Sequence, residues 1–232
     1  MLVLGYLVLD IDKTRDPDYA KKSKDHLYDY PIHLASTSLE TDTKARFVIY
    51  SARTWGDKGR FSSHSWFAYK KAKESQYSIM QVLGWLDINQ NDSFIEMRTG
   101  RPDFYWIGSK PTLVCNVSGK KAEQIIESVE AIIENYPFLD EYVEYPGPNS
   151  NTFTQYVISE FNIEQLCTLS TTAIGKYYGK NSSFKDEEIF INIFEAVHIQ
   201  YTPRTKEFCL IGMCWMQKDK RILFPVLGGD SE

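Results

Sequence analysis

The stretch SGKKAEQIIESVEAIIENYP, residues 118–137, separates two differently patterned regions and decides the fold class. Ser118 is the expected N-cap of a helix, and the helix should end before Tyr136-Pro137, because the residue before a proline resists the helical conformation. Apolar residues recur at i, i+3, i+4 and i+7, on one helical face: Ala122, Ile125, Ile126, Val129, Ile132 and Ile133. The pattern predicts one amphipathic helix over about 119–135.

Short apolar runs bounded by turn residues lie before this helix and predict strands. They cover residues 47–52, 63–69, 77–85, 94–98, 104–107 and 113–117. After the helix, the Pro-Gly-Pro of YPGPNSNTF (residues 145–153) cannot continue a helix or a ladder, so a second helix should begin at about Asn149 or Ser150. Residues 168–183 read as a loop and 189–227 as further strands. The chain is therefore predicted to be α+β, with an antiparallel sheet packed against two or more helices.

Length and charge favour one soluble domain without nucleic-acid binding. The 232 residues suit one substantial domain, which we place at 46–228 after an N-terminal strand and polar extension at 1–45. The net charge of −5 disfavours a basic nucleic-acid footprint. Met1–Leu9 is apolar, but it is too short to span a bilayer and lacks the features of a signal peptide. We expect no transmembrane segment and a soluble, cytoplasmic protein, or a membrane-anchored one if an upstream segment is missing.

The cysteines and histidines suggest neither a metal site nor a cofactor. The four cysteines, with no CxxC pair, predict free buried thiols in a reducing compartment: Cys115, Cys167, Cys209 and Cys214. His26, His33 and His198 have no partners at metal-ligand spacing. We therefore expect no metal and no cofactor.

Two residues suggest chemistry when they are taken together. Ser150 stands at the start of the second predicted helix, where unpaired N–H groups favour an anionic nucleophile or an oxyanion. His64, on a predicted strand, would act as its general base. Gln81 on the next strand would orient the imidazole, with Asp103 and Asn151 as weaker alternatives. The alternative is structural: Ser150 would be an N-cap and His64 a hydrogen-bonded core residue.

Four segments carry a resemblance to a known family. SHSWF (63–67), GRPDFYW (100–106), YPGPNSNTF (145–153) and TTAIGK (171–176) resemble those of a bacterial family of unknown function, DUF3750, over roughly residues 46–228. That family has no established activity, so the resemblance implies a domain identity and no function.

A more distant resemblance implies a mechanism. A strand histidine, further strands and then Asn-(Cys)-Asn-x-Phe opening a helix is similar to circularly permuted papain-like proteins of the NlpC/P60 and lecithin:retinol acyltransferase type. His64 matches their histidine, and Ser150 replaces their nucleophilic cysteine. The resemblance implies a permuted papain-like topology and a hydrolase or acyltransferase acting on an amide or ester, with backbone N–H groups near Ser150 and Asn151 as the oxyanion site. The alternative is an inactive scaffold that binds a peptide, glycan or lipid head group.

Five further residues are candidates for binding a small-molecule, peptide or lipid ligand. Asn149 and Asn151 flank Ser150, and Trp66 follows His64 by two residues. Arg101, in a Gly-Arg-Pro-Asp turn, and Lys176, in a Gly-bearing loop, offer positive charge to an anion. The structural alternatives are an aromatic core for Trp66, a plain turn for Arg101 and a solvated basic loop for Lys176, and the core and loop alternatives are the favoured ones.

Overall fold

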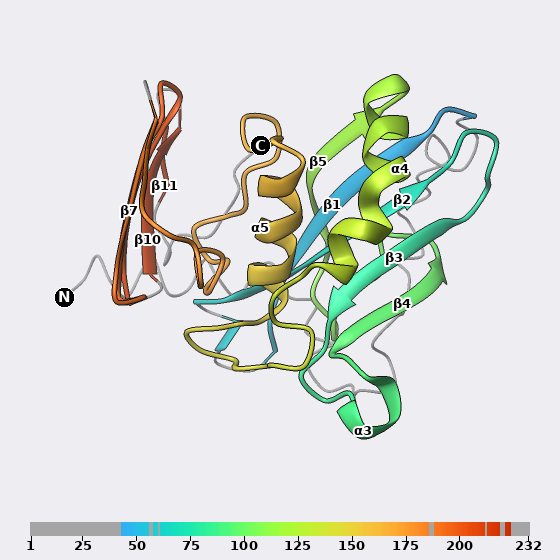
Figure 1. Ribbon diagram of the computed structural model, residues 1–232, viewed down its shortest axis with the longest axis horizontal. Helices are drawn as coiled ribbons and strands as arrows, with labels where there is room; N and C mark the ends of the chain where they lie inside the picture. Colours follow the sequence, from blue (N-terminus) through green and yellow to red (C-terminus); the bar gives the residue numbers. More distant parts are fainter. Residues whose placement is uncertain are drawn as a thin grey trace.

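The structure, a computed structural model, describes residues 43–55, 58–59, 61–185, 188–211, 213–218 and 221–223. Over these residues it contains two antiparallel sheets and three helices, which confirms the predicted α+β class (Figure 1). The strand expected at Met1–Leu9 and most of the polar extension expected up to residue 45 lie outside the described residues.

The first sheet has five strands in the order β4-β3-β2-β1-β5. Their bounds are β1 (Arg46–Arg53), β2 (Ser63–Lys70), β3 (Tyr77–Val82), β4 (Ile95–Gly100) and β5 (Thr112–Ser118). Five predicted strands are thereby confirmed, but the one at 104–107 is wrong, because Trp106 makes only an isolated bridge to Ser109. Between them Ile107 and Gly108 have positive φ values of 43° and 81°, which turn the chain back at once.

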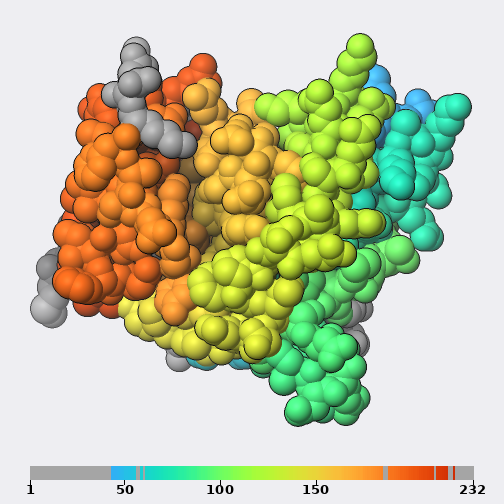
Figure 2. Space-filling view, in the orientation of Figure 1, coloured from blue at the N-terminus to red at the C-terminus, as the bar shows by residue number. Residues whose placement is uncertain are grey.

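The second sheet is a six-stranded meander, whose strands pair in the order β11-β10-β9-β8-β7-β6. They are β6 (Ser183–Lys185), β7 (Glu188–Ile193), β8 (Val197–Tyr201), β9 (Thr205–Leu210), β10 (Met213–Lys218) and β11 (Arg221–Leu223), which confirms the further strands expected after residue 189. Figure 1 shows this sheet edge-on at the left of the view, and in Figure 2 it forms the end of the molecule opposite β2 and β3.

The helices are α3 (Ile88–Asn91), α4 (Lys120–Glu134) and α5 (Ser150–Glu160). The predicted N-cap Ser118 is wrong: it is the last residue of β5, and the N-cap of α4 is Gly119, which makes no side-chain cap. Apolar residues of α4 and α5 pack with Phe47 and Phe67 on one face of the first sheet. No helix of the described ranges is long and apolar enough to cross a membrane.

The other face of the first sheet holds a separate aromatic core without helices. Its buried members include Tyr50 from β1, Trp66 from β2, and Phe104 and Trp106 from the segment after β4. The central strand β2 is consequently buried along its whole length. This burial on both faces is what keeps its polar residues away from water.

The expectation of free thiols is wrong, because all four cysteines are paired. Cys115 of β5 is bonded to Cys167 after α5, and Cys209 of β9 to Cys214, its register partner on β10. Disulfides persist in oxidising compartments, so the expectation of a reducing compartment loses its support. Neither pairing was accessible from spacing, because each depends on which strand and loop the fold brings together.

We predict that the bond between Cys115 and Cys167 is the main covalent stabiliser of the first sheet. It closes a loop with a sequence separation of 52, whereas Cys209–Cys214 spans 5. Loop-closure entropy predicts a loss of about 4 kcal/mol of unfolding free energy for Cys115→Ala/Cys167→Ala and about 2 kcal/mol for Cys209→Ala/Cys214→Ala. Urea unfolding of both double variants measures the difference, and equal losses would contradict the prediction.

Candidate functional site

A pocket of about 530 Å³ lies where β2 begins, β3 ends and α5 begins. This volume is in the usual range for a small-ligand site. Ser150, His64, Asn149 and Asn151 all line it, so the fold brings together four of the residues singled out from the sequence. Six of its nineteen lining residues are aromatic: Trp55, Phe61, Trp85, Trp106, Tyr142 and Tyr145.

Asn149 is the residue that caps α5. Its side-chain oxygen accepts hydrogen bonds from the N–H groups of Asn151 (2.9 Å) and Thr152 (3.3 Å). The Thr152 hydroxyl accepts in return from the Asn149 N–H at 3.0 Å, which completes a capping box. The structural alternative for Ser150, that it is the N-cap, is therefore wrong, because Ser150 is the first residue inside the helix.

The amide groups of Asn149 and Asn151 tie the start of α5 to three other segments. Asn149 Nδ2 donates to the carbonyls of Glu144 and Ile174, and Asn151 Nδ2 donates to those of Ser63 and Ile174. Both amide nitrogens are fully used in this way. The two residues, predicted to bind substrate, therefore position the pocket wall with these groups and have no amide donor left for a ligand.

Gly175 is required at this junction. Its φ is +84°, and an added Cβ would lie 2.5 Å from Asn149 Nδ2 and 2.7 Å from the Pro146 carbonyl oxygen. A side chain at this position would therefore displace the cap of α5 or the loop that precedes it.

His64 belongs to a chain of hydrogen bonds that defines its tautomer. Gln81 Nε2 donates to Glu96 Oε2 at 2.6 Å, which leaves Gln81 Oε1 facing His64 Nε2 at 2.8 Å. An amide oxygen only accepts, so His64 carries its proton on Nε2. Nδ1 is then a bare lone pair, the form that can accept a proton.

Burial keeps this imidazole neutral. His64 is 5% exposed, and its ring stacks on Trp106 with centroids 3.6 Å apart and planes 5° from parallel. Desolvation lowers the pKa of His64 to about 3, and the hydrogen bond with Gln81 opposes that shift only in part. At neutral pH the ring is therefore always in its base form.

No hydrogen bond joins His64 to Ser150, although both line the same pocket. Strand alternation directs the His64 side chain to the sheet face of Trp66, whereas α5 packs on the opposite face. Both line the same pocket because His64 is the second residue of β2, at the end of the sheet where α5 begins. A bound substrate would have to draw the two groups into contact, as is common for catalytic groups whose hydrogen bonds are long without substrate.

Of the two backbone N–H groups expected to form the oxyanion site, that of Ser150 is available and that of Asn151 is not. The Asn151 N–H is already donated to Asn149, so it is not free for an oxyanion. The first-turn N–H that the Asn149 side chain leaves unused is that of Ser150. The remaining candidate for binding an oxyanion is therefore the Ser150 N–H, at the positive end of an 11-residue helix.

Trp66 and Arg101, two of the predicted ligand-binding residues, do not line the pocket. Trp66 is fully buried, donates its Nε1–H to the Pro102 carbonyl at 2.8 Å and stacks on Phe104. Arg101 is paired with Asp103, with Nη2 2.9 Å from Oδ2. The structure assigns both to the architecture around Trp106 rather than to the cavity.

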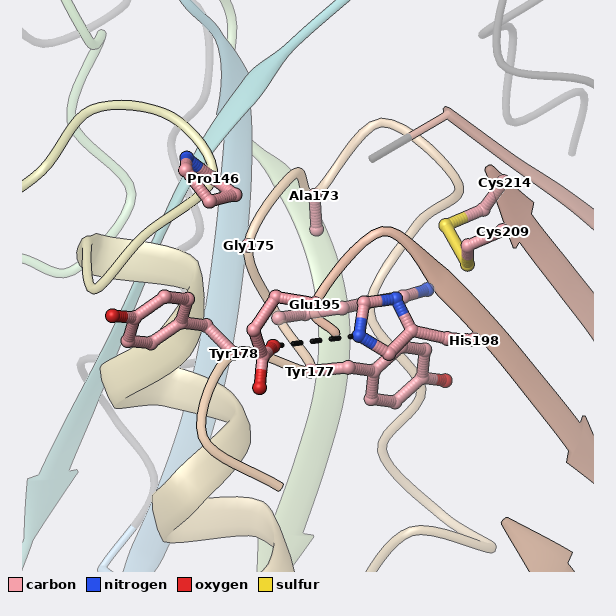
Figure 3. Close-up of a pocket in the computed structure, with 10 residues that line it drawn as sticks. Pro146, Ala173, Gly175, Tyr177, Tyr178, Glu195, His198, Cys209 and Cys214 are labelled. Carbon is pink, nitrogen blue, oxygen red and sulfur yellow. Dashed lines mark ion pairs between the residues drawn. A yellow bond between two sulfur atoms is a disulfide. The ribbon is translucent and has the colours of Figure 1, made fainter. Parts of the chain in front are cut away.

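Lys176 is also away from the pocket, and it is neither solvated nor open to an anion. Its Nζ is 2.6 Å from Glu207 Oε1 in a fully buried pair between the 168–180 loop and β9. Figure 3 shows the neighbouring cavity of about 10 Å³, enough for one water, beside Tyr177, His198 and the disulfide. Glu195 lies 3.5 Å from His198 there, and burial lowers the pKa of His198 against the effect of that carboxylate.

The metal-ligand types among the described residues gather at Glu207, Cys209 and Cys214. Both sulfurs are in a disulfide, and the Glu207 carboxylate is held by Lys176 and by the Tyr177 hydroxyl. No donor of this group is left to bind an ion.

The sequence did not reveal the tryptophans of the pocket wall, nor Glu96, which accepts a hydrogen bond from Gln81. Trp106, Trp85 and Trp55 form a continuous series leading from His64, with ring centroids 5.6 and 6.1 Å apart. Four tryptophans within residues 55–106 were a signal, but strand aromatics fill cores far more often than they line clefts. Glu96 became visible only from the register that places it opposite Gln81.

The chain was compared with known proteins. The model of the family described as Protein of unknown function (DUF3750) matches residues 44–178. The match covers the first sheet, α4, α5 and the pocket, and it ends before the second sheet. The resemblance expected to continue to residue 228 stays a prediction beyond residue 178. No curated protein and no solved structure matches the chain.

The cap assignment predicts different fates for two neighbouring substitutions. Asn149→Ala removes the cap and leaves buried carbonyls unpaired, so the free energy of unfolding should fall by about 1–2 kcal/mol or more. Ser150→Ala removes neither the cap nor a partner of these carbonyls, so it should change the free energy of unfolding by less than about 0.5 kcal/mol. Urea unfolding of both variants measures this. A larger loss for Ser150→Ala would make Ser150 the structural residue.

The lowered pKa of His64 predicts a pH-dependent stability. Between pH 6.5 and about 3 the unfolded chain binds a proton at this ring and the folded chain does not. Stability therefore falls as pH decreases through this window, by up to about 1.4 kcal/mol per pH unit from this group. The His64→Gln variant should lose that part of the slope.

A nuclear magnetic resonance titration of the ring tests the same point directly. The His64 Cε1 shift should stay constant from pH 8 to pH 4.5 in the folded chain. A midpoint near pH 6.5 would show that the ring is solvated and would contradict the burial argument.

Proposed function

We propose that this chain, which belongs to the DUF3750 family, is a hydrolase or acyltransferase that uses Ser150 as nucleophile and His64 as general base. The observation that carries the proposal is the Glu96–Gln81–His64 chain, because it presents a bare Nδ1 in the pocket that Ser150 lines. Gln81 would be a positioning residue that holds the ring and its tautomer. The likeness to permuted papain-like proteins supports the same roles.

The proposed reaction is acyl transfer from an ester or amide. Ser150 Oγ attacks the carbonyl carbon while its proton passes to His64 Nδ1. The carbonyl oxygen becomes negative and accepts a hydrogen bond from the Ser150 N–H at the helix N-terminus. The bond to the leaving group then breaks, and His64 returns the proton to the leaving oxygen or nitrogen. Water or an acceptor alcohol or amine then removes the acyl group from Ser150 by the same steps in reverse.

The burial of His64 limits how this base can work. A ring with a pKa near 3 is always unprotonated at neutral pH, but it accepts a proton weakly. Transfer would have to be coupled to attack, with Glu96 supporting the imidazolium through Gln81. A serine hydroxyl cannot be stored as an anion in the way that a cysteine thiolate can, so this coupling is also what the nucleophile requires.

The lining of the pocket indicates the kind of substrate. The series of Trp55, Trp85 and Trp106 offers flat apolar faces next to His64. At the rim, exposed Lys58 and Glu144 form an ion pair of 2.5 Å, a pair that a zwitterionic or amide-bearing ligand can replace. An apolar acyl group with a polar leaving group suits both features.

A second candidate is binding without chemistry. The specific observation in its favour is that Ser150 and His64 make no hydrogen bond to each other, whereas the aromatic side chains that could bind a ligand already line the pocket. The cavity would then bind a peptide, glycan or lipid head group through the tryptophan series.

Labelling with a panel of fluorophosphonates distinguishes the two candidates. We expect the wild-type chain to be labelled at Ser150 and Ser150→Ala not to be labelled. His64→Ala and the closer-sized His64→Asn should slow labelling at least 100-fold, and Gln81→Ala about 10-fold, because they remove the base and its orientation. Ser128→Ala, exposed on α4, is the matched control and should be labelled like the wild type.

Labelling that persists in Ser150→Ala would exclude Ser150 as the nucleophile. If the wild type is not labelled by any probe, the acyl-transfer proposal fails. Quenching of tryptophan fluorescence by ligands, lost in Trp106→Phe, would then support the binding candidate.

A further inference from the structure

The second sheet departs from the usual polarity of an antiparallel sheet, because its inner face mixes buried apolar side chains, such as Phe190 and Met216, with buried polar ones. The face toward the rest of the molecule carries polar groups, with Glu207 buried against Lys176 and Tyr177 and with His198 nearby. An antiparallel sheet ordinarily turns its apolar residues inward and its polar residues to water. In this sheet the inner face is only partly apolar, and the polarity of the outer face follows from the strand registers.

The printed strand registers define that outer face. Phe208 of β9 is exposed and pairs with Ile199 on β8 and Trp215 on β10, so these three share one face. Following the alternation across all six strands gives fourteen outward positions, of which all but Lys206 and Gln217 are apolar: Phe184, Ile189, Ile191, Ile193, Val197, Ile199, Tyr201, Lys206, Phe208, Leu210, Met213, Trp215, Gln217 and Ile222. We call this surface the outer apolar face. Figure 1 shows the sheet edge-on, with one side turned away from α5 and the first sheet.

The outer apolar face is too large for an ordinary monomer surface. Nine of its twelve apolar side chains are more than a third exposed. Because large side chains present roughly 150–250 Å² each, the face leaves on the order of 1,000 Å² of apolar surface. The largest patch on a typical monomer is about 300–600 Å². A standard protein interface buries about 800 Å² per partner.

We infer that the outer apolar face is an interface between two copies of this chain. Two such sheets packed face to face would form a sandwich about 10 Å thick, related by a two-fold axis. The central row of Ile191, Ile199, Phe208 and Trp215 carries no charge, so no like charges meet at the axis. Lys206 lies in the next row with its Nζ 5.5 Å from the Tyr201 ring, away from that axis.

Two other occupants fit the face less well. Even fully extended along the face, the nine residues Met1–Leu9 would cover a width of only about 5 Å, whereas the face is six strands across. Binding to an anionic membrane surface favours several lysines and arginines on the contact face, but Lys206 is the one basic residue among the fourteen outward positions, on a chain of net charge −5. A second copy matches both the width and the neutrality of the face.

Sedimentation velocity on the full chain from 1 to 100 µM tests this inference. We expect a wild-type dimer, and we expect Phe208→Glu to weaken association at least 100-fold, because it places a charge at the two-fold axis. Met97→Glu, at an exposed apolar position of β4, is the matched control and should remain dimeric. Ile199→Lys tests the same row independently if Phe208→Glu fails to fold, as judged by circular dichroism.

A wild-type chain that stays monomeric over this range overturns the inference, as does a dimer that is disrupted equally by Met97→Glu. If the wild type is monomeric but deletion of residues 1–42 produces a dimer, the N-terminal segment is the occupant. If the monomer instead floats with phosphatidylserine vesicles in a Phe208-dependent manner, the occupant is a membrane surface. Both of these outcomes also overturn it.

Discussion

The constraint on which the rest of the site depends is the start of α5. A helix beginning inside the protein must satisfy its first N–H groups without water, and Asn149 does this with one side-chain oxygen. The amide nitrogens of Asn149 and Asn151 then bind three carbonyls from the 144–148 loop, the 174–175 loop and β2. The two asparagines that organise the start of α5 therefore also hold the wall of the pocket in place. Ser150 is the residue that this arrangement leaves without a structural task, at the positive end of the helix and inside the pocket.

The opposite side of the pocket depends on a buried polar chain. Burying His64 between sheet and Trp106 would be unfavourable for a charged ring, and it is tolerated because the ring is neutral and Gln81 accepts its one proton. Glu96 in turn determines which way the Gln81 amide faces. The same burial that makes His64 a permanent base also makes it a weak one. Any chemistry at this site therefore rests on electrostatic support from residues behind the ring.

The second sheet connects the pocket to the outer apolar face. Lys176 and Glu207 are fully buried, and their pairing holds the 168–180 loop against β9. That loop contributes Ile174 to the pocket and its carbonyl to both asparagines. The inner face of the sheet combines this polar contact with a small apolar cluster around Phe190, while twelve apolar positions of its strands face outward. Beyond the span matched by the family model, the chain thus has a sheet whose inner side supports the site and whose outer side is free to associate.

The sequence by itself determined the local features: the period of α4, the start of α5, ten of the eleven strands as apolar runs or strand regions, and the place of His64 and Gln81 on neighbouring strands. These follow from short-range rules of spacing, capping and turn chemistry. Tertiary structure alone decided the rest: that Asn149 and not Ser150 is the cap, that the cysteines pair, that Trp66, Arg101 and Lys176 are occupied elsewhere, and that Trp106 covers His64. Each of these depends on the register between strands or on the packing of distant loops. A one-residue change of register turns every side chain of a strand to the other face, and no local pattern contains that information.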